Sequence, residues 1–220
     1  RYPGRSTLGA TLMITQSFLY NAIFFTYATV LSTFFGVENT ALYYIPFAIG
    51  NFLGPLLLGP LFDTIGRKPL ISGTYILSGA LLVISAFLFK AGALTATTQT
   101  IAWCVIFFFA SAGASAAYLT VSEIFPMETR ALCISVFYAV GTGLGGIIGP
   151  LLFSRLVATG KFSQAALGLI LGASMMIIGG LVELVYGVKA EGRALEDIAQ
   201  PLTAEDSAEG TPRRAVAATA

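Results

Sequence analysis

The 220-residue sequence has no histidine, two cysteines, and charged side chains at only 10% of its positions. Without histidine the chain cannot build His-based catalytic triads, His metal ligands or the usual pH switch. A soluble domain carries about 25% charged residues, so the low charge nearly excludes a water-soluble globular protein. The net charge of +1 gives no indication of a nucleic-acid partner.

The scarcity of reactive side chains also argues against an enzyme. A membrane hydrolase needs a nucleophile, a base or metal ligands clustered at one depth, and no acidic residue lies near the centre of an apolar segment. Cys104 and Cys133 lie within apolar segments, where cysteine is more typical of a packed small residue than of a disulfide or metal site. We therefore expect no enzymatic activity, no metal and no cofactor.

Hydrophobic residues are abundant and make up 56% of the chain. They form six segments, each long enough to cross about 30 Å of hydrocarbon as a helix. The segments cover residues 7–35, 41–62, 70–89, 101–121, 131–157 and 165–188. We predict an all-α membrane protein in which residues 1–189 form a six-helix transmembrane bundle. Charge and proline return in residues 190–220, which we expect to form a cytoplasmic tail with a short helix followed by disorder.

The distribution of lysine and arginine predicts the orientation of the bundle. With an even number of spans, both ends of the chain lie on one side, and nine of the 12 Lys and Arg residues fall there. Lys90, Arg155 and Lys161 fall on the other side. We expect both ends to be cytoplasmic, in a multi-pass protein of the plasma (inner) membrane.

Glycine is frequent, with 24 residues, and it clusters within the apolar segments. Gly141, Gly143, Gly145 and Gly146 superficially resemble a dinucleotide-binding loop, but that loop requires a preceding strand in a soluble sheet. Small residues on membrane helices let two backbones approach closely. The glycine pattern therefore predicts tight helix packing.

Polar side chains within the apolar segments need an explanation, because burying them in a membrane is costly. Gln16 and Asn21 lie in the first segment, about 140° apart around a helix, and Asn51 lies in the second. From the residues alone, hydrogen bonds between helices and a substrate site are equally good interpretations. Glu183 lies late in the sixth segment, and we expect it to reach the lipid headgroups, with a proton relay as the weaker alternative.

A charged turn joins the second and third segments at residues 63–69, Asp-Thr-Ile-Gly-Arg-Lys-Pro. Gly66 permits a tight reversal of the chain. Asp63 and Arg67 lie four residues apart and can pair, while Arg67 and Lys68 place the turn on the positive side.

A second charged connection lies at residues 122–130, Ser-Glu-Ile-Phe-Pro-Met-Glu-Thr-Arg. Pro126 interrupts a helix there, so Glu123 and Arg130 fall on opposite sides of the break. Close to Arg67, these two residues would form one ion-pair cluster at the cytoplasmic face.

At these two connections the sequence resembles the major facilitator superfamily of transporters. The D-x-x-G-R-K/R turn is its signature between the second and third helices and again between the eighth and ninth. The S-E-I-F-P-x-x-x-R stretch resembles that of the sugar porter branch between the tenth and eleventh helices. Together the motifs place this chain, through about Ile198, on helices seven to twelve, which is the C-terminal half of such a transporter.

The resemblance extends to residues that bind sugar in the sugar porters. Gln16 and Asn21 match a glutamine and an asparagine of helix seven, and Asn51 matches an asparagine of helix eight. Thr15 replaces a further glutamine, and Tyr118 stands where a tryptophan stacks on the sugar. The glycine-rich fifth segment looks more like that of metabolite–proton and aromatic-acid symporters, so a sugar or an organic acid is the expected solute.

The resemblance implies secondary active transport of a small polar organic solute by alternating access. A latch of the outward-facing state would be formed at the cytoplasmic face by Asp63, Gly66, Arg67, Lys68, Glu123 and Arg130. The carboxylate for proton coupling is usually in the first half of such proteins, so coupling cannot be argued from this chain.

The resemblance also implies a partner, the N-terminal six-helix half, which precedes these helices in the superfamily. Because the sequence opens on Arg1, we expect a piece of a longer protein. Two alternatives stay open: a six-span half-transporter that acts as a homodimer, and a non-transporting membrane sensor. A start codon just before Arg1 would favour the homodimer, and six further spans upstream would exclude it.

Overall fold

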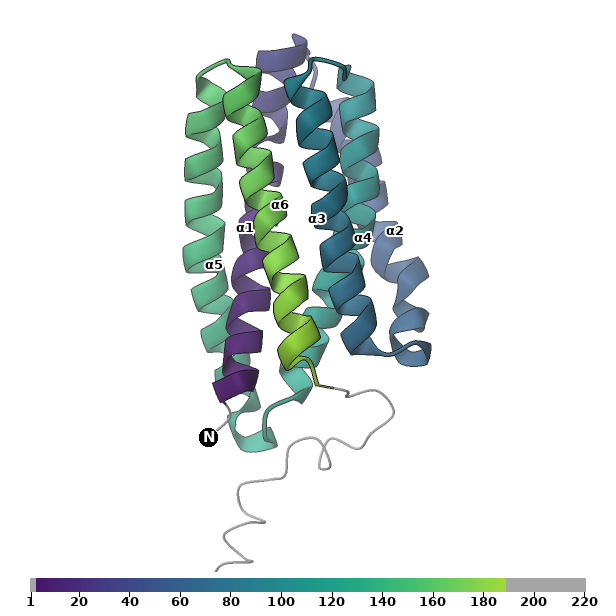
Figure 1. Ribbon diagram of the computed structural model, residues 1–220, viewed down its shortest axis with the longest axis vertical. Coiled ribbons are helices and arrows are strands. Elements are labelled where there is room, and N and C mark those ends of the chain that lie inside the picture. Colours follow the sequence, from purple (N-terminus) through teal and green to yellow (C-terminus); the bar gives the residue numbers. More distant parts are fainter. Residues whose placement is uncertain (1–2, 189–220) are drawn as a thin grey trace, which may run out of the picture.

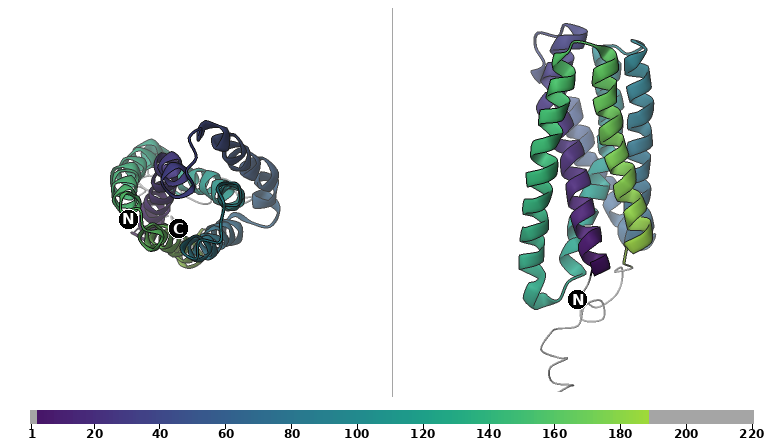
Figure 2. Two further views of the ribbon diagram at one scale, coloured as in Figure 1. Left: turned by 90° about the horizontal axis from the view of Figure 1, so that it is seen from above. Right: turned by 60° about the vertical axis from the view of Figure 1, so that its left-hand side comes forward.

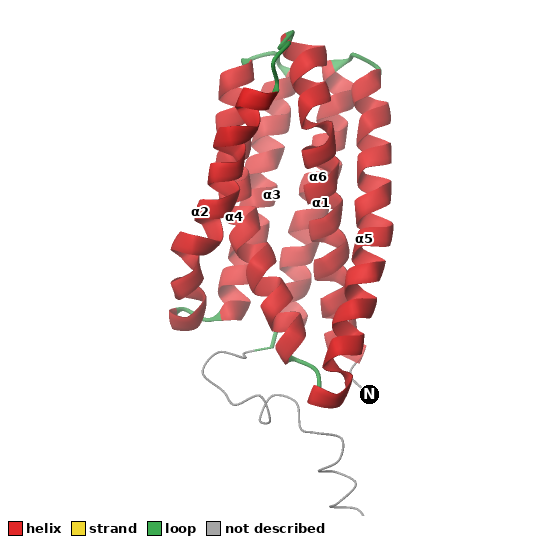
Figure 3. Ribbon diagram, turned by 180° about the vertical axis from the view of Figure 1, so that it is seen from behind, coloured by secondary structure: helices red, strands yellow, loops and turns green. Residues whose placement is uncertain are grey.

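A computed structural model describes residues 3–188 of the chain as a bundle of six long α-helices with no strand among them (Figures 1 and 3). The helices are α1 (Pro3–Phe35), α2 (Ala41–Thr64), α3 (Arg67–Lys90), α4 (Ala96–Glu123), α5 (Met127–Ala158) and α6 (Phe162–Tyr186). All six are long and apolar enough to cross a membrane. The predicted all-α membrane fold is thus confirmed. The predicted tail at 190–220 lies outside the described residues.

Most of the helices extend beyond the apolar segments from which they were predicted. The clearest case is α4, which begins at Ala96 rather than near residue 101. Thr95 caps this helix, because its hydroxyl accepts a hydrogen bond from the Thr98 amide at 3.3 Å. The Thr98 hydroxyl accepts one from the Thr95 amide at 2.8 Å, which completes a capping box. Hydrophobicity therefore places a helix, while polar caps determine where it begins.

The chain divides into two successive units of three helices, α1–α3 and α4–α6, whose corresponding helices run in opposite directions. The first helix of each unit packs mainly on the second helix of the other unit, so α1 lies on α5 and α4 lies on α2. The third helices of the two units, α3 and α6, pack on each other. The view along the bundle shows α5 and α2 at opposite flanks (Figure 2). This arrangement has the pseudo-two-fold relation of inverted repeats.

Glycines make the closest helix contacts of the two flanks. A Cβ on Gly145 of α5 would collide with the Ile14 carbonyl oxygen of α1, and one on Gly54 of α2 would collide with the Phe108 carbonyl oxygen of α4. Only hydrogen fits at these positions, so the backbones approach directly. The interpretation of the glycine clusters as packing surfaces is confirmed. The two cysteines are free and partly buried.

The flanking helices are also the least buried of the six. Large apolar side chains are exposed on both of them, including Leu56 and Leu57 of α2 and Ile147 and Leu151 of α5. In contrast, α1, α3, α4 and α6 enclose most of the apolar core. The bundle therefore presents two extensive apolar flanks.

Candidate functional site

The charged turn between α2 and α3 lies at the end of the bundle where α1 begins, which we call the N-terminal end (Figure 1). Gly66 caps α3 with φ of 110°, a conformation that side-chain-bearing residues rarely adopt. This reversal makes Arg67 the first residue of α3 and turns its side chain toward α4. The sequence expectation that Gly66 forms the tight turn agrees with this geometry.

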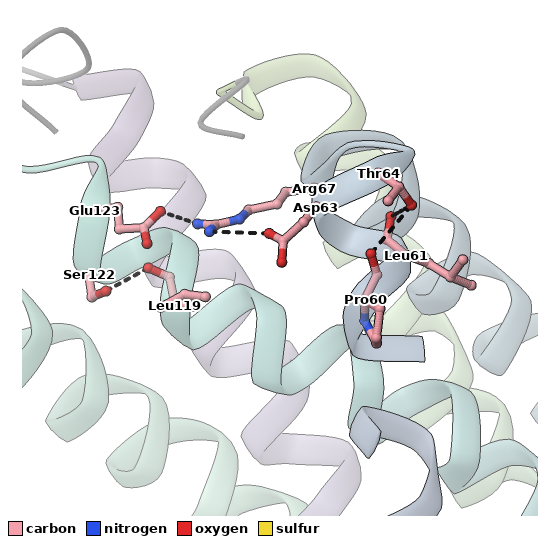
Figure 4. A network of polar contacts seen from close by, with 8 residues as sticks. All are labelled: Pro60, Leu61, Asp63, Thr64, Arg67, Leu119, Ser122 and Glu123. Atoms are coloured by element: carbon pink, nitrogen blue, oxygen red, sulfur yellow. Dashed lines mark hydrogen bonds and ion pairs between the residues drawn. The ribbon is translucent and has the colours of Figure 1, made fainter. Parts of the chain in front are cut away.

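Arg67 is the centre of a charged cluster that links the two turns of this end. Its Nη1 donates a hydrogen bond to Oε2 of Glu123, the last residue of α4 (Figure 4). Its Nη2 lies 3.8 Å from Oδ1 of Asp63. The Arg67 side chain is only 11% exposed, whereas that of Asp63 is 73% exposed. The pair with Glu123 is therefore enclosed, and the pair with Asp63 is solvated.

Arg130 is not brought into this cluster. It lies in the first turn of α5, beyond Pro126, and its Nε is buried with no hydrogen-bond partner among residues 3–188. A different arginine binds the α4–α5 turn: Nη1 of Arg5 donates to the Ile124 carbonyl oxygen at 2.6 Å. No local pattern in the sequence reveals this contact, because Arg5 and the turn are far apart in the chain.

Lys68 points away from the cluster, toward the end of α6. Its side chain packs beside Gly187, and its charge faces Glu183. Glu183 is 0% exposed, and neither carboxylate oxygen has a hydrogen-bond partner in the described part of the chain. Contrary to expectation, Glu183 is thus enclosed between α6 and α3 and does not extend outward toward headgroups. Its neighbour Tyr75 is likewise fully buried with an unpaired hydroxyl.

The three amides proposed to bind solute do not converge on one point. Asn21 donates from Nδ2 to the carbonyl and hydroxyl oxygens of Ser17, at 2.8 and 3.1 Å, within its own helix. Gln16 is buried and interacts with Tyr118 of α4. Asn51 of α2 accepts a hydrogen bond from the Tyr20 hydroxyl at 3.1 Å. Tyr20, which the sequence reasoning missed, is the residue that ties Asn51 to α1.

Asn51 also lines an open groove of about 780 Å³ between α1 and α2. Half of its lining residues are aromatic: Phe24 of α1 with Tyr44, Phe47 and Phe52 of α2. The sequence contained a usable signal for this lining, since Tyr44, Phe47 and Asn51 are spaced three and four residues apart and share one helix face. Neither Gln16 nor Asn21 lines the groove.

The described residues contain no group of three His, Cys, Asp or Glu side chains that could hold a metal ion. The polar chemistry of the bundle is therefore limited to hydrogen bonds and to the charged cluster at its N-terminal end. These groups can bind a solute and hold helix ends together.

Six membrane-type helices around enclosed polar side chains, with charged turns at one end, define a multi-pass membrane protein of the transporter class. The sequence model described as "Sugar (and other) transporter" matches residues 2–202, and the chain belongs to this family of transporters. No curated protein matches the chain.

Proposed function

We propose that this chain is the C-terminal half, helices seven to twelve, of a secondary active transporter that moves a small polar organic solute, a sugar or an organic acid, by alternating access. The enclosed pair of Arg67 and Glu123 is the observation that carries the proposal. It joins the turn after α2 to the end of α4, where the two superfamily motifs lie. In alternating access two bundles rock about a central site, and a charged contact between turns stabilises the state in which that end is closed.

The proposed latch has a centre and a periphery. Arg67, Glu123 and the Gly66 turn form the centre, since they are partly enclosed and directly connected. Asp63 contributes from the exposed edge, and Lys68 anchors the start of α3 to the end of α6 through its attraction to Glu183. Arg130 lies close in sequence to this centre, but its Nε has no hydrogen-bond partner among residues 3–188.

The partner of the bundle would be the N-terminal six-helix half, seated against α2 and α5. The exposed apolar side chains on these two flanks support this assignment, because a large apolar surface on a transporter half needs either lipid or a second bundle against it. A second copy of the chain is the alternative partner. Measuring the mass of the purified complex, expressed with every residue encoded before Arg1, separates one chain of twelve helices from a pair of six-helix chains.

The orientation we propose places the N-terminal end of the bundle in the cytoplasm, in the plasma membrane. Arg5, Arg67, Lys68 and Arg130 lie at this end. The basic residues of the opposite end are Lys90, Arg155 and Lys161. Labelling of single cysteines introduced at Thr64 and at Thr159, with a membrane-impermeant reagent on intact cells, tests this orientation, and labelling at Thr64 alone would reverse it.

The solute site we propose lies at Asn51, which Tyr20 holds in place, while Gln16 and Asn21 would meet the solute elsewhere on its path, from other faces of α1. The decisive experiment is counterflow in proteoliposomes, because a carrier exchanges labelled for unlabelled solute whereas a sensor does not. A panel of sugars, carboxylates and aromatic acids serves as the unlabelled solute. Uptake that follows an imposed pH gradient would show proton coupling. Absence of exchange for every solute, with binding retained, would favour the sensor.

A further inference from the structure

The groove between α1 and α2 has the size and composition of a small-molecule site. Ligand pockets usually enclose about 300–1,000 Å³ and combine apolar walls with a few polar groups. This groove encloses about 780 Å³, and its lining is aromatic and aliphatic except for the Asn51 amide and the Tyr44 hydroxyl. No charged residue lines it.

The rings of the groove form a continuous aromatic wall. The Phe24 ring lies 5.8 Å from that of Tyr44 in an edge-to-face arrangement and 6.2 Å from that of Phe47. Phe47 in turn packs 4.6 Å from Phe107 in the core, which fixes its position. Phe52 is 67% exposed, so its ring is available at the mouth of the groove. Faces and edges of such rings favour a planar aromatic guest.

The hydrogen-bonding capacity of the groove is small. Oδ1 of Asn51 already accepts from the Tyr20 hydroxyl, and its Nδ2 has no hydrogen bond to the described residues and can donate to a guest. The Tyr44 hydroxyl already donates to the Phe24 carbonyl oxygen at 3.3 Å. A sugar carries several hydroxyls, and each one buried without a partner costs about 1–3 kcal/mol. With polar groups on only two of its lining residues, the groove fits a guest with one polar group better than a sugar with several hydroxyls.

The other amides do not supply the missing partners. Nδ2 of Asn21 donates to the Ser17 carbonyl oxygen within α1. Gln16 faces Tyr118 on another side of the same helix. The α5 segment facing Asn21 is glycine, with Gly146 packed against the Asn21 side chain. The amides that would surround one sugar are therefore distributed over separate faces.

We propose that the α1–α2 groove binds a solute with one planar aromatic ring and one hydrogen-bond acceptor group, which Asn51 Nδ2 holds while Phe24, Phe47 and Phe52 enclose the ring. This inference rests on the proposed transport function and narrows its solute class. The acceptor can be the oxygen of a carboxylate or of a neutral carbonyl, and the experiment below separates these two.

The test is binding of radiolabelled benzoate to the purified protein, expressed with every residue encoded before Arg1. Unlabelled benzoate, cyclohexanecarboxylate, benzamide and D-glucose serve as competitors. We expect saturable binding that benzoate displaces better than cyclohexanecarboxylate, its non-planar counterpart, and that D-glucose does not displace. Benzamide separates the two acceptors, since displacement equal to that by benzoate identifies any carbonyl, and no displacement identifies a carboxylate.

Substitution of two similarly exposed phenylalanines, one inside the groove and one outside it, distinguishes loss of a groove contact from loss of any exposed ring. Phe52→Ala removes a groove ring and should weaken benzoate binding by about two- to tenfold, as expected for one aromatic contact. Phe87→Ala removes a ring of α3 that is 58% exposed and lies outside the groove, and it should leave binding unchanged. Asn51→Ala should weaken benzoate and benzamide binding while the folded state is retained in a thermal unfolding assay.

Equal effects of Phe52→Ala and Phe87→Ala, displacement by D-glucose, or no saturable benzoate binding would each overturn the inference. The proposed function has a separate readout, since counterflow of D-glucose without benzoate binding would retain the transporter and remove the aromatic site. Benzoate binding without counterflow of any solute would retain the site and remove the transporter.

Discussion

Arg67 and Glu123 lie 56 residues apart in the sequence and form a hydrogen-bonded ion pair between the start of α3 and the end of α4. Their side chains are only 11% and 18% exposed. An ion pair this enclosed is screened less than a surface pair, and removing one partner leaves the other charge without compensation. The two turns at the N-terminal end are therefore mechanically connected through one guanidinium group.

Arg67→Ala should reduce uptake by the intact transporter at least about tenfold, corresponding to the loss of a charged hydrogen bond of about 1.5–3 kcal/mol. Uptake is measured in proteoliposomes at matched protein amounts, with the membrane level checked by immunoblot. Lys161→Ala, at the opposite end of the bundle, is the control and should leave uptake near normal. Unchanged uptake in Arg67→Ala would rule out the latch.

Asp63→Asn should have a smaller effect than Arg67→Ala. Asp63 is 73% exposed and 3.8 Å from Arg67, and exposed pairs contribute only about 0–1 kcal/mol. We therefore expect uptake to fall by no more than about fivefold. High salt screens this pair, so the difference in uptake between the variant and the unmodified protein should become smaller as salt is added. A loss as large as that of Arg67→Ala would show that Asp63 has an additional partner, such as a helix end of the N-terminal half.

Gly145→Ala should destabilise the bundle by about 1–3 kcal/mol, because the new methyl group would enter the backbone contact with α1 and force the helices apart. Gly143→Ala in the same helix is a matched control, since nothing lies within 4 Å of its Cβ position. Alanine there should be neutral or stabilising by up to about 1 kcal/mol through its helix propensity. Thermal unfolding in detergent measures both, and equal melting temperatures would contradict the packing role.

Tyr20→Phe removes the hydroxyl that donates to Asn51 and leaves the ring packed 4.9 Å from Phe107. Solute binding should weaken by about two- to tenfold, because Asn51 then loses the contact that orients its amide. Tyr186→Phe, at the end of α6 and outside the groove, is the control. Solute binding is measured by titration, and a loss in Tyr186→Phe as large as that in Tyr20→Phe would remove Tyr20 from the site.

Lys68→Met should destabilise the protein more than the double variant Lys68→Met/Glu183→Leu. The single change leaves the fully buried Glu183 without its facing positive charge, whereas the double change removes the carboxylate as well. The unfolding temperatures of the unmodified protein, the two single variants Lys68→Met and Glu183→Leu, and the double variant together form a double-mutant cycle. Additive effects would show that Lys68 and Glu183 do not interact.

The fold was largely predictable because a membrane helix is specified by length and hydrophobicity alone. The turn at Gly66 and the Asp63–Arg67 pair were equally accessible, since both are local in sequence. The contact of Arg67 with Glu123 needed the family resemblance, because the residues are brought together by packing of α3 on α4.

Other features depend on rotation of each helix about its axis, which composition does not determine. Glu183 was expected near headgroups because it lies close to a helix end, yet its side chain faces α3 and is enclosed. The family resemblance implied that the amides Gln16 and Asn21 contribute to one solute site. Their partners, Tyr118 on α4 and Ser17 on α1 itself, direct them to different faces.

The glycine contacts of Gly54 and Gly145 affect how the bundle can deform. At these points α2 lies on α4, and α5 lies on α1, with a glycine directly against a backbone carbonyl of the facing helix. Packed helices that lack interlocking side chains accommodate force by small sliding movements. A load applied at either flank is therefore taken up as shear along these two contacts.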